Sequence, residues 1–306
     1  MDITVLQQQK IRDLSHSSRG TFAACPRKSQ LAKLINGFRE DTVHTVFGTA
    51  VAAGIQTWFG DTTWVPAEQL RENGGYLSRE EAATLAVFLA WKVSVHDKVT
   101  KSKKSLGYAI FMVEKFIADC NMGELPFADW EFVGAEVGFK LLLPGGFKYR
   151  GFIDLILISP DGLPAIIEFK TTGNTYSSDA DWKNSEQGTS YSLVLPAIVP
   201  GATRYLMYYV VGLSGSQRWV SYDFIKGDRE KLDFVQDLLA ETKVIEFYEK
   251  LPRFPMRGNS CSSFGRECAF FGVCNLPTER LVDFGQVQLE PEDKYQYVIN
   301  LEHLGT

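Results

Sequence analysis

Apolar residues recur at helical spacing through the first 120 residues of the chain. Spacings of three and four positions put such residues on one face of a helix, so this part is predicted to be mostly helical. Ser78, with Glu81 three positions later, forms the sequence pattern of a capping box and marks the start of one of these helices. The predicted helices cover residues 25–37, with Gly37 as the stop signal, and residues 45–60, 78–99 and 104–121.

The pattern changes near residue 130, where apolar residues come in short runs separated by turn signals. Runs at 130–143, 147–159 and 164–172 are joined by "PGG" and "PDGLP", and this arrangement predicts a β-meander. A helix within 182–201 is predicted next, then strands at 204–213 and 217–225 and a long helix at 228–250. The fold class is therefore predicted to be α/β.

These patterns divide the chain into three consecutive parts of one compact unit. Residues 1–125 form a helical N-terminal region, and residues 126–250 form the α/β core. Residues 251–306 contain a segment rich in Gly, Pro and Cys that cannot supply much core.

Composition and charge narrow the class of protein. The chain has 306 residues, of which 45% are hydrophobic and 23% charged, as in globular proteins. No apolar run approaches the ~20 residues of a membrane span, and the first residues lack an apolar signal core, so a cytoplasmic protein is expected. The net charge of −5 argues against coating nucleic acid through bulk charge. The basic run at 92–105 is either a solvated helix face or a local contact for phosphate.

The stretch "PAIIEFKTTG" at residues 164–173 carries two charged residues at the end of an apolar strand. Alternation along a strand puts Glu168 and Lys170 on the same face, about 6.5 Å apart. The preceding strand has its own acid, Asp154, within an apolar run where an unpaired charge is costly. Gly151 permits a close approach of another backbone, and the short "PDGLP" loop makes the two strands neighbours. Asp154 and Glu168 are therefore predicted to lie together.

Two carboxylates at one place repel each other unless a cation lies between them. Mg²⁺ or Mn²⁺, which prefer oxygen ligands, would remove this repulsion, and Glu136 one strand earlier is a candidate third carboxylate. A lysine beside such an ion suits phosphodiester hydrolysis, because it can orient the attacking water and neutralise charge that develops on the phosphoryl group. The alternative is a surface pair of Glu168 and Lys170 with an unrelated Asp154.

The ordered set "GFID…EFK" resembles the core of the PD-(D/E)xK nuclease superfamily, and in particular its RecB-like branch. That branch adds a Gln-x-x-x-Tyr motif on the helix after the lysine strand, where this chain has "SEQGTSYSLVL". The resemblance implies a restriction-endonuclease-like core, in which a central mixed sheet is flanked by helices. The catalytic residues that it implies are Asp154, Glu168, Lys170, Gln187 and Tyr191, and the metal ligands are Asp154, Glu168 and the carbonyl of Phe169.

Four of the five cysteines extend the resemblance. Some RecB-like nucleases, including CRISPR-associated and phage relatives, carry one cysteine in an N-terminal "CPR" helix and three beyond the core, and hold an iron–sulfur cluster with them. The matching residues here would hold a [4Fe–4S] cluster, with Zn²⁺ as the alternative for the same four ligands. Such a clasp would staple the N-terminal helices to the C-terminus, whereas Cys120 is expected to be a small buried residue. The four predicted ligands are Cys25, Cys261, Cys268 and Cys274.

One segment departs from the family pattern. Relatives have a histidine metal ligand in a "GxxxHxxxE"-like setting on an early glycine-rich helix. The matching segment here, "FGTAVAAGIQ", has Ala52 and Gln56 where the histidine and the glutamate are expected. This departure leaves open whether metal binding is weakened or lost.

The function that these features predict is that of a Mg²⁺- or Mn²⁺-dependent deoxyribonuclease, an exonuclease on DNA ends or single strands in recombination, repair or phage replication. The alternative is a non-catalytic DNA-binding or scaffold protein that keeps the fold and the cysteine clasp. A four-cysteine redox protein is a third alternative, but it leaves the acids and the lysine unexplained. The expected partners are DNA and recombination or replication proteins in a bacterial or phage-infected cell. Exo- or endonuclease action, strand polarity, DNA or RNA preference and oligomeric state stay open.

Overall fold

The computed structural model describes residues 10–35, 41–95, 104–201, 205–263, 266–284 and 294–305. The chain divides into two compact units that interleave along the sequence. The terminal unit comprises residues 1–40, 138–152 and 228–306, and the central unit comprises residues 41–137 and 153–227. The division into three consecutive parts, made from the sequence, stays a prediction.

A seven-stranded mixed sheet runs in the order β6-β5-β4-β3-β2-β9, with the short β1 paired to β3. β3 and β4 are antiparallel, β4 and β5 are parallel, and β5 and β6 are antiparallel. The predicted meander and the mixed α/β fold class are thereby confirmed. The strands are β1 (Asp13–Leu14), β2 (Glu131–Leu143), β3 (Phe147–Ile158), β4 (Pro164–Thr172), β5 (Leu206–Leu213), β6 (Arg218–Phe224) and β9 (Tyr297–Asn300).

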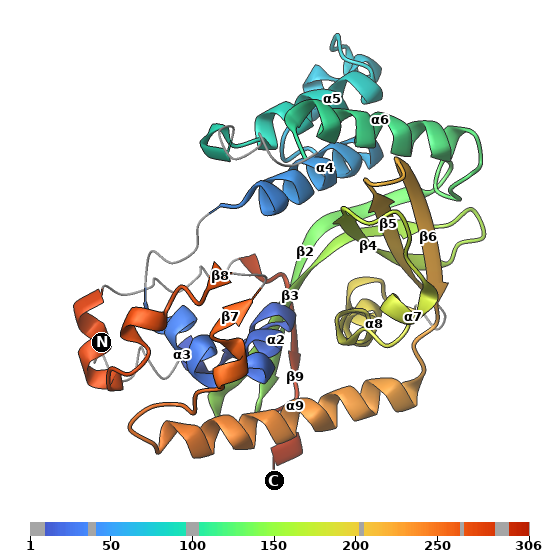
Figure 1. The fold of residues 1–306 in the computed structure, drawn as a ribbon. Helices are drawn as coiled ribbons and strands as arrows, with labels where there is room; N and C mark the ends of the chain where they lie inside the picture. Colours follow the sequence, from blue (N-terminus) through green and yellow to red (C-terminus); the bar gives the residue numbers. More distant parts are fainter. Residues whose placement is uncertain are drawn as a thin grey trace. The chain divides into compact units, whose positions relative to one another are not determined.

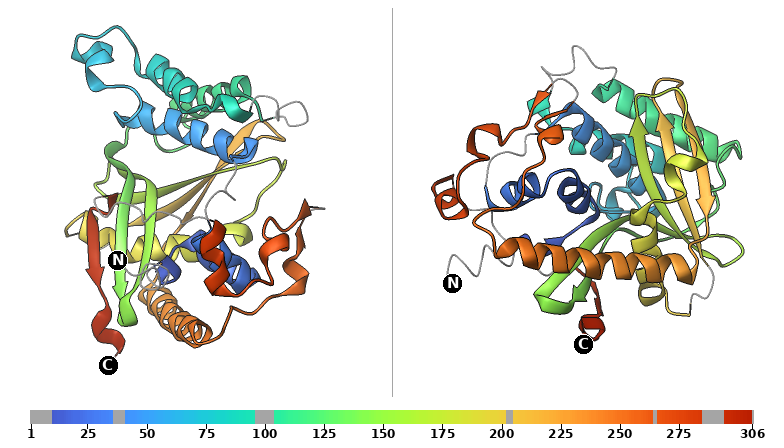
Figure 2. Two further views of the ribbon diagram at one scale, coloured as in Figure 1. Left: turned by 90° about the vertical axis from the view of Figure 1, so that its left-hand side faces the viewer. Right: turned by 60° about the horizontal axis from the view of Figure 1, so that its bottom comes forward.

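Within the central unit, helices cover both faces of the strands β4, β5 and β6 (Figures 1 and 2). α4 (Val43–Phe59), α5 (Arg79–Ala90) and α6 (Leu106–Asn121) form a layer on one face. α7 (Asp179–Trp182) and α8 (Glu186–Ile198) lie on the other. This three-layer arrangement buries both faces of the sheet, as is usual where parallel strands are joined through a helix.

The capping box predicted at Ser78 is present, because Ser78 Oγ accepts from the Glu81 N–H and the Glu81 carboxylate accepts from the Ser78 N–H. The helix that it starts ends at Ala90, well before the predicted residue 99. Trp91 has extended backbone there, and the β-branched Val93 and Val95 that follow favour helix less than the preceding alanines. The middle of the basic run at 92–105, residues 96–103, lies outside the described residues.

The connection from β4 to β5 passes through α8, since two parallel strands cannot be joined by a tight turn. Gly188 near the start of α8 approaches β5 closely, and its N–H donates to Tyr209 Oη at 3.1 Å. A Cβ at Gly188 would lie 3.1 Å from the same oxygen. This close approach fixes the first turn of α8 beside the end of β4.

Packing between α4, α5 and α6 depends on Gly54, where a Cβ would lie 2.7 Å from Val87 Cγ2 and 2.9 Å from Val113 Cγ2. We expect Gly54→Ala to lower the free energy of unfolding by about 1–3 kcal/mol, because both neighbours are buried and must shift. Chemical denaturation measures this loss. Gly107→Ala on α6 is the matched control, because its Cβ meets nothing within 4 Å; an equal loss in both variants would contradict the packing argument.

The terminal unit contains α2 (His16–Ala24), α3 (Pro26–Leu34), the long α9 (Asp228–Glu249) and a small hairpin of β7 (Ser262–Ser263) and β8 (Arg266–Glu267). The predicted helix at 25–37 is α3, which ends at Leu34; its predicted stop signal, Gly37, lies outside the described residues. α2, β1 and β9 were not predicted. No helix in the described ranges is long and apolar enough to cross a membrane.

Candidate active site

Near its C-terminal end, β4 directs alternate side chains to the two faces of the sheet. Phe169 faces the core, where its ring packs edge-on against Phe116 of α6 with centroids 6.0 Å apart. Side chains alternate along a strand, so Glu168 and Lys170 face the opposite side, toward α8. Glu168 is 2% exposed, whereas 35% of the Lys170 side chain is exposed. Glu168 and Lys170 therefore lie on the same face of β4, as the sequence predicts.

The hairpin between β3 and β4 brings Asp154 to the same place. Leu155 pairs with Ile167, and one further step in that register puts Asp154 opposite Glu168. The Phe169 N–H donates to Asp154 Oδ2 at 2.9 Å. The turn that sets this register is closed by the Ser159 N–H donating to the Leu163 carbonyl at 2.9 Å, with Gly162 in the left-handed region (φ 78°).

A ring of hydrogen bonds joins β4 to α8. Lys170 Nζ donates to Glu168 Oε1 and, at 3.1 Å, to Gln187 Oε1. Gln187 Nε2 donates to Tyr191 Oη at 2.7 Å, and a hydrogen bond from the Tyr191 hydroxyl partly offsets the rise in the pKa of Glu168 that burial causes. Gln187 and Tyr191 lie one helical turn apart, so both side chains leave the same face of α8. The structure thus brings together the five residues predicted to be catalytic.

Burial dominates the electrostatics of the two acids. Desolvation raises the pKa of Asp154 well above its ordinary value, and the nearby charges of Glu168 and Glu136 raise it further. Desolvation also raises the pKa of Glu168, although Lys170 opposes the shift. Burial lowers the pKa of Lys170, but Glu168 and Asp154 more than offset this, and the pKa of the lysine is raised. The lysine is therefore an ammonium at neutral pH.

Glu136 and Gln56 lie next to Asp154 and are joined to it by hydrogen bonds of Gln56. Gln56, 2% exposed, lies on α4, and its Nε2 donates to Glu136 Oε1 at 3.0 Å and to the Asp154 carbonyl at 2.8 Å. Gln56 was noted in the sequence only as a departure from the family pattern. Its hydrogen bonds span 80 and 98 residues of chain, so no local pattern could have shown them. Ala52 lies one turn earlier on the same face of α4.

The donor set fits a hard divalent cation. Glu168 Oε2 is buried and has no hydrogen-bond partner among the described residues, although a buried polar atom normally has one. A cation would satisfy this oxygen and neutralise the clustered carboxylates. No three His, Cys, Asp or Glu side chains in the described ranges are arranged as a ready-made metal cage. The candidate ligands are thus the adjacent carboxylates of Asp154 and Glu168, with Glu136 at the edge of the site. They do not form a complete coordination shell.

The raised carboxyl pKa values predict how the stability of the metal-free protein depends on pH. Between the ordinary carboxyl pKa of about 4 and the raised values, the folded protein binds more protons than the unfolded chain. The contribution of this pair to the free energy of unfolding therefore falls as pH rises through that range. We expect Asp154→Asn to flatten the fall, measured by denaturation in chelator at a series of pH values. Parallel curves for the two proteins would contradict this expectation.

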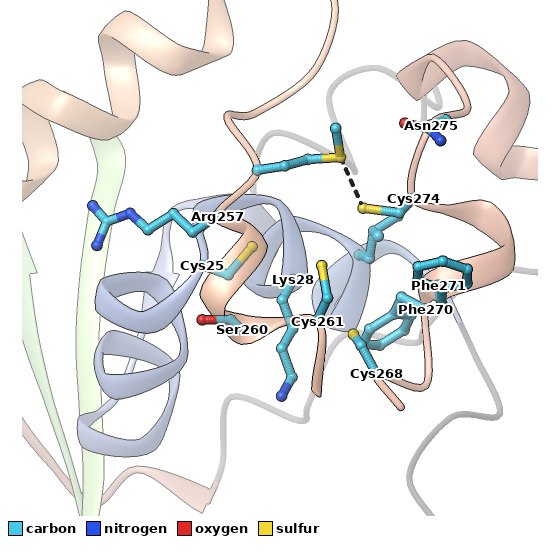
Figure 3. A pocket seen from close by; sticks show the side chains of 12 residues that line it. Cys25, Lys28, Arg257, Ser260, Cys261, Cys268, Phe270, Phe271, Cys274 and Asn275 are labelled. Atoms are coloured by element: carbon cyan, nitrogen blue, oxygen red, sulfur yellow. Dashed lines mark hydrogen bonds between the residues drawn. The ribbon is translucent and has the colours of Figure 1, made fainter. Parts of the chain in front are cut away.

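A second group of candidate ligands lies within the terminal unit. Figure 3 shows the four predicted cysteine ligands around one pocket. The volume of this pocket is ≈ 220 Å³. The β7–β8 pairing, continued by one step, puts Cys261 opposite Cys268, and the Cys268 N–H donates to the Cys261 carbonyl at 2.8 Å. Cys25 comes from the residue before α3, and Cys274 follows a short 3₁₀ turn. Cys274 Sγ also lies 3.2 Å from Met256 Sδ (Figure 3).

Polar contacts from α3 hold the cysteine loop in place. Arg27 is fully buried, and its guanidinium donates to the carbonyls of Cys274, at 3.0 Å, and Leu276. Gln30 Oε1 accepts from Arg27 and from the Phe254 N–H. The pocket is therefore supported by hydrogen bonds between α3 side chains and main-chain groups, and these do not involve the sulfur atoms.

Four thiols line this pocket, but within the described part of the chain they are not arranged as a ready-made metal cage. Burial raises the pKa of Cys274, Arg27 lowers it, and the other three thiols raise it, so the four groups interact electrostatically. Thiolates are the ligands that zinc and iron–sulfur clusters prefer. Cys120 lies apart in the core of the central unit, where burial raises its pKa to about 12. It is a structural residue, as predicted.

Comparisons with known proteins place the chain in a family and support its fold. The sequence profile of the PD-(D/E)XK nuclease superfamily matches residues 13–275. No curated protein matches the chain. A crystal structure from Eubacterium rectale named "Putative exonuclease" is 12% identical, covering 93% of this chain and 92% of its own with a TM-score of 0.50. The structure of SSO0001 is 13% identical and covers 82% and 92%, with a TM-score of 0.32.

The chain belongs to the PD-(D/E)XK nuclease superfamily. The likeness to the Eubacterium rectale structure extends over nearly the whole of both chains and supports the restriction-endonuclease-like fold. Members of this superfamily are nucleases that act on nucleic acid, and they typically use divalent metals such as Mg²⁺ or Mn²⁺.

Proposed function

We propose that the protein is a Mg²⁺- or Mn²⁺-dependent deoxyribonuclease of the RecB-like kind that degrades DNA from its ends. The observation that carries this proposal is the ring of hydrogen bonds joining Glu168 and Lys170 to Gln187 and Tyr191, with Asp154 opposite Glu168. A surface ion pair would need no such support. The exonuclease assignment is also favoured by the name of the Eubacterium rectale structure.

Asp154, Glu168 and the Phe169 carbonyl would hold the cation, with Glu136 at the rim, and the cation would supply Lewis-acid stabilisation of the scissile phosphate. Lys170 has three N–H donors, of which Glu168 and Gln187 occupy two. The third is left for the attacking water or a phosphate oxygen. Gln187 holds the ammonium at this position, and Tyr191 in turn orients the Gln187 amide.

Cleavage of labelled DNA tests the proposal directly. Linear single- and double-stranded DNA, with free or chemically blocked ends, is incubated with Mn²⁺, Mg²⁺ or chelator. We expect mononucleotides or short oligonucleotides from free ends only, and only with metal. Products from blocked substrates would establish endonuclease action. Binding without cleavage under all conditions would instead favour a DNA-binding protein that keeps the nuclease fold.

We further propose that the four cysteines of the terminal unit bind a metal centre, a [4Fe–4S] cluster with Zn²⁺ as the alternative. The convergence of Cys25, Cys261, Cys268 and Cys274 on one pocket supports this. The two alternatives differ in colour, because only the cluster absorbs visible light. Anaerobic purification followed by visible absorption and elemental analysis decides between them.

A further inference from the structure

The carboxamide of Gln56 has an unusual set of partners. A primary amide nitrogen has two hydrogens, and both are used within the candidate active site. One hydrogen bond goes to the side chain of Glu136 and the other to the main chain of Asp154. Gln56 lies in the last turn of α4, and it and Thr57 are the polar residues among the buried positions of this helix. A glutamine that only filled space in the core would not need to join two site residues.

Glu136 is itself held in an unfavourable conformation. Its φ of 46° lies in the left-handed region, which non-glycine residues adopt rarely and at a cost. The burial pattern along β2 changes directly after Glu136, where a continuous run of buried residues begins at Val137. Glu136 is exposed, yet its charge raises the pKa values of both Asp154 and Glu168. The strained backbone thus brings a third negative charge to the acid pair.

We propose that Gln56 is a positioning residue that holds Glu136 in place as a third carboxylate of the metal site. This inference rests on the proposed metal-dependent function. The amide is suited to this role because it donates to Glu136 without adding charge. A glutamate at position 56 would repel Glu136 across the 3.0 Å contact.

The proposal has a consequence for metal stoichiometry. When Asp154, Glu168 and Glu136 are ionised beside the Lys170 ammonium, the site carries a net charge of minus two. One divalent cation neutralises that charge. The neutral Gln56 keeps the site at this balance, so we expect one tightly bound Mn²⁺ per chain.

The experiment measures Mn²⁺ binding in the absence of DNA, by calorimetry or electron paramagnetic resonance. It compares the wild type with Gln56→Met, Glu136→Gln and the double variant. Removing a group that orients a metal ligand typically costs 10- to 100-fold in affinity. We expect about tenfold weaker binding for each single variant and no further loss in the double variant. Effects that do not add show that the two residues act through one interaction.

Thr57→Val is the matched control, because Thr57 is the next residue on α4, 3% exposed, with a hydroxyl that has no partner among the described residues. It is expected to bind Mn²⁺ like the wild type. Wild-type affinity in Gln56→Met, or losses that add in the double variant, would overturn the positioning role alone. A wild-type protein that binds no Mn²⁺ would overturn both this role and the proposed function. A lowered melting temperature in chelator with unchanged Mn²⁺ affinity would identify Gln56 as merely structural.

Discussion

Replacing Asp154 with asparagine is expected to lower the rate of metal-dependent DNA cleavage by at least about 10³-fold. Asparagine keeps the size of the side chain but removes the charge that faces Glu168 across the hairpin. A cation would then lose an anionic ligand, and Glu168 alone with Lys170 is close to neutral. The initial rate of release of labelled nucleotide from linear DNA measures the effect.

The same variant is expected to be more stable than the wild type in the absence of metal. Burial and the charges of Glu168 and Glu136 raise the pKa of Asp154, so ionisation of Asp154 at neutral pH opposes folding. A gain in stability with a loss of activity is typical of residues kept for function. Asp161→Asn, at the exposed turn of the same hairpin, is the control and should change neither property. Full activity in Asp154→Asn would refute the assigned role.

The second large effect is expected for Cys25→Ala. The four cysteines converge from both ends of the sequence on one pocket, so loss of Cys25 is expected to release the proposed metal centre. Loss of a structural metal is among the few changes that cost more than about 4 kcal/mol. We expect the melting temperature to fall by roughly 5–10 °C, measured by calorimetry together with the metal content of the purified protein.

Cys120→Ala is the matched control, because Cys120 is 1% exposed but lies within the core of the central unit. It is expected to keep its full metal content and to lose only the small packing contribution of one sulfur atom. Cys25→Ala that retained a full complement of metal would contradict the four-thiolate centre. The four-thiolate centre would also be contradicted if Cys25→Ala and Cys120→Ala showed equal falls in melting temperature and neither variant contained metal.

Much of the candidate active site could be predicted because its main residues lie close together in the sequence. An acid within an apolar run is costly, and a short turn forces neighbouring strands together, so Asp154 and Glu168 were placed from local pattern alone. Gln187 and Tyr191 followed from the resemblance to a known family. The structure shows these residues in contact, whereas their catalytic roles stay predictions.

The remaining elements depend on contacts between distant parts of the chain. Gln56 reaches Glu136 across 80 residues, and its role in the site is visible only in three dimensions. β1 and β9 have two and four residues, too few for a periodic pattern to show. The end of α5 at Ala90 was mispredicted because the apolar pattern continued beyond the helix. Local pattern predicts elements, but not which of them pair.

The turn between β3 and β4 has a consequence for how such chains can change in evolution. Its closed hydrogen bonds fix the number of residues between Asp154 and Glu168. Successive residues of a strand point to opposite faces of the sheet. A shift of the β3–β4 pairing by one residue therefore moves all the side chains of the shifted strand to the other face. A single inserted residue in the turn that shifted the ladder would therefore separate the two acids while leaving every one of these amino acids in place. The length of this turn, and not only the identity of the acids around it, encodes the site.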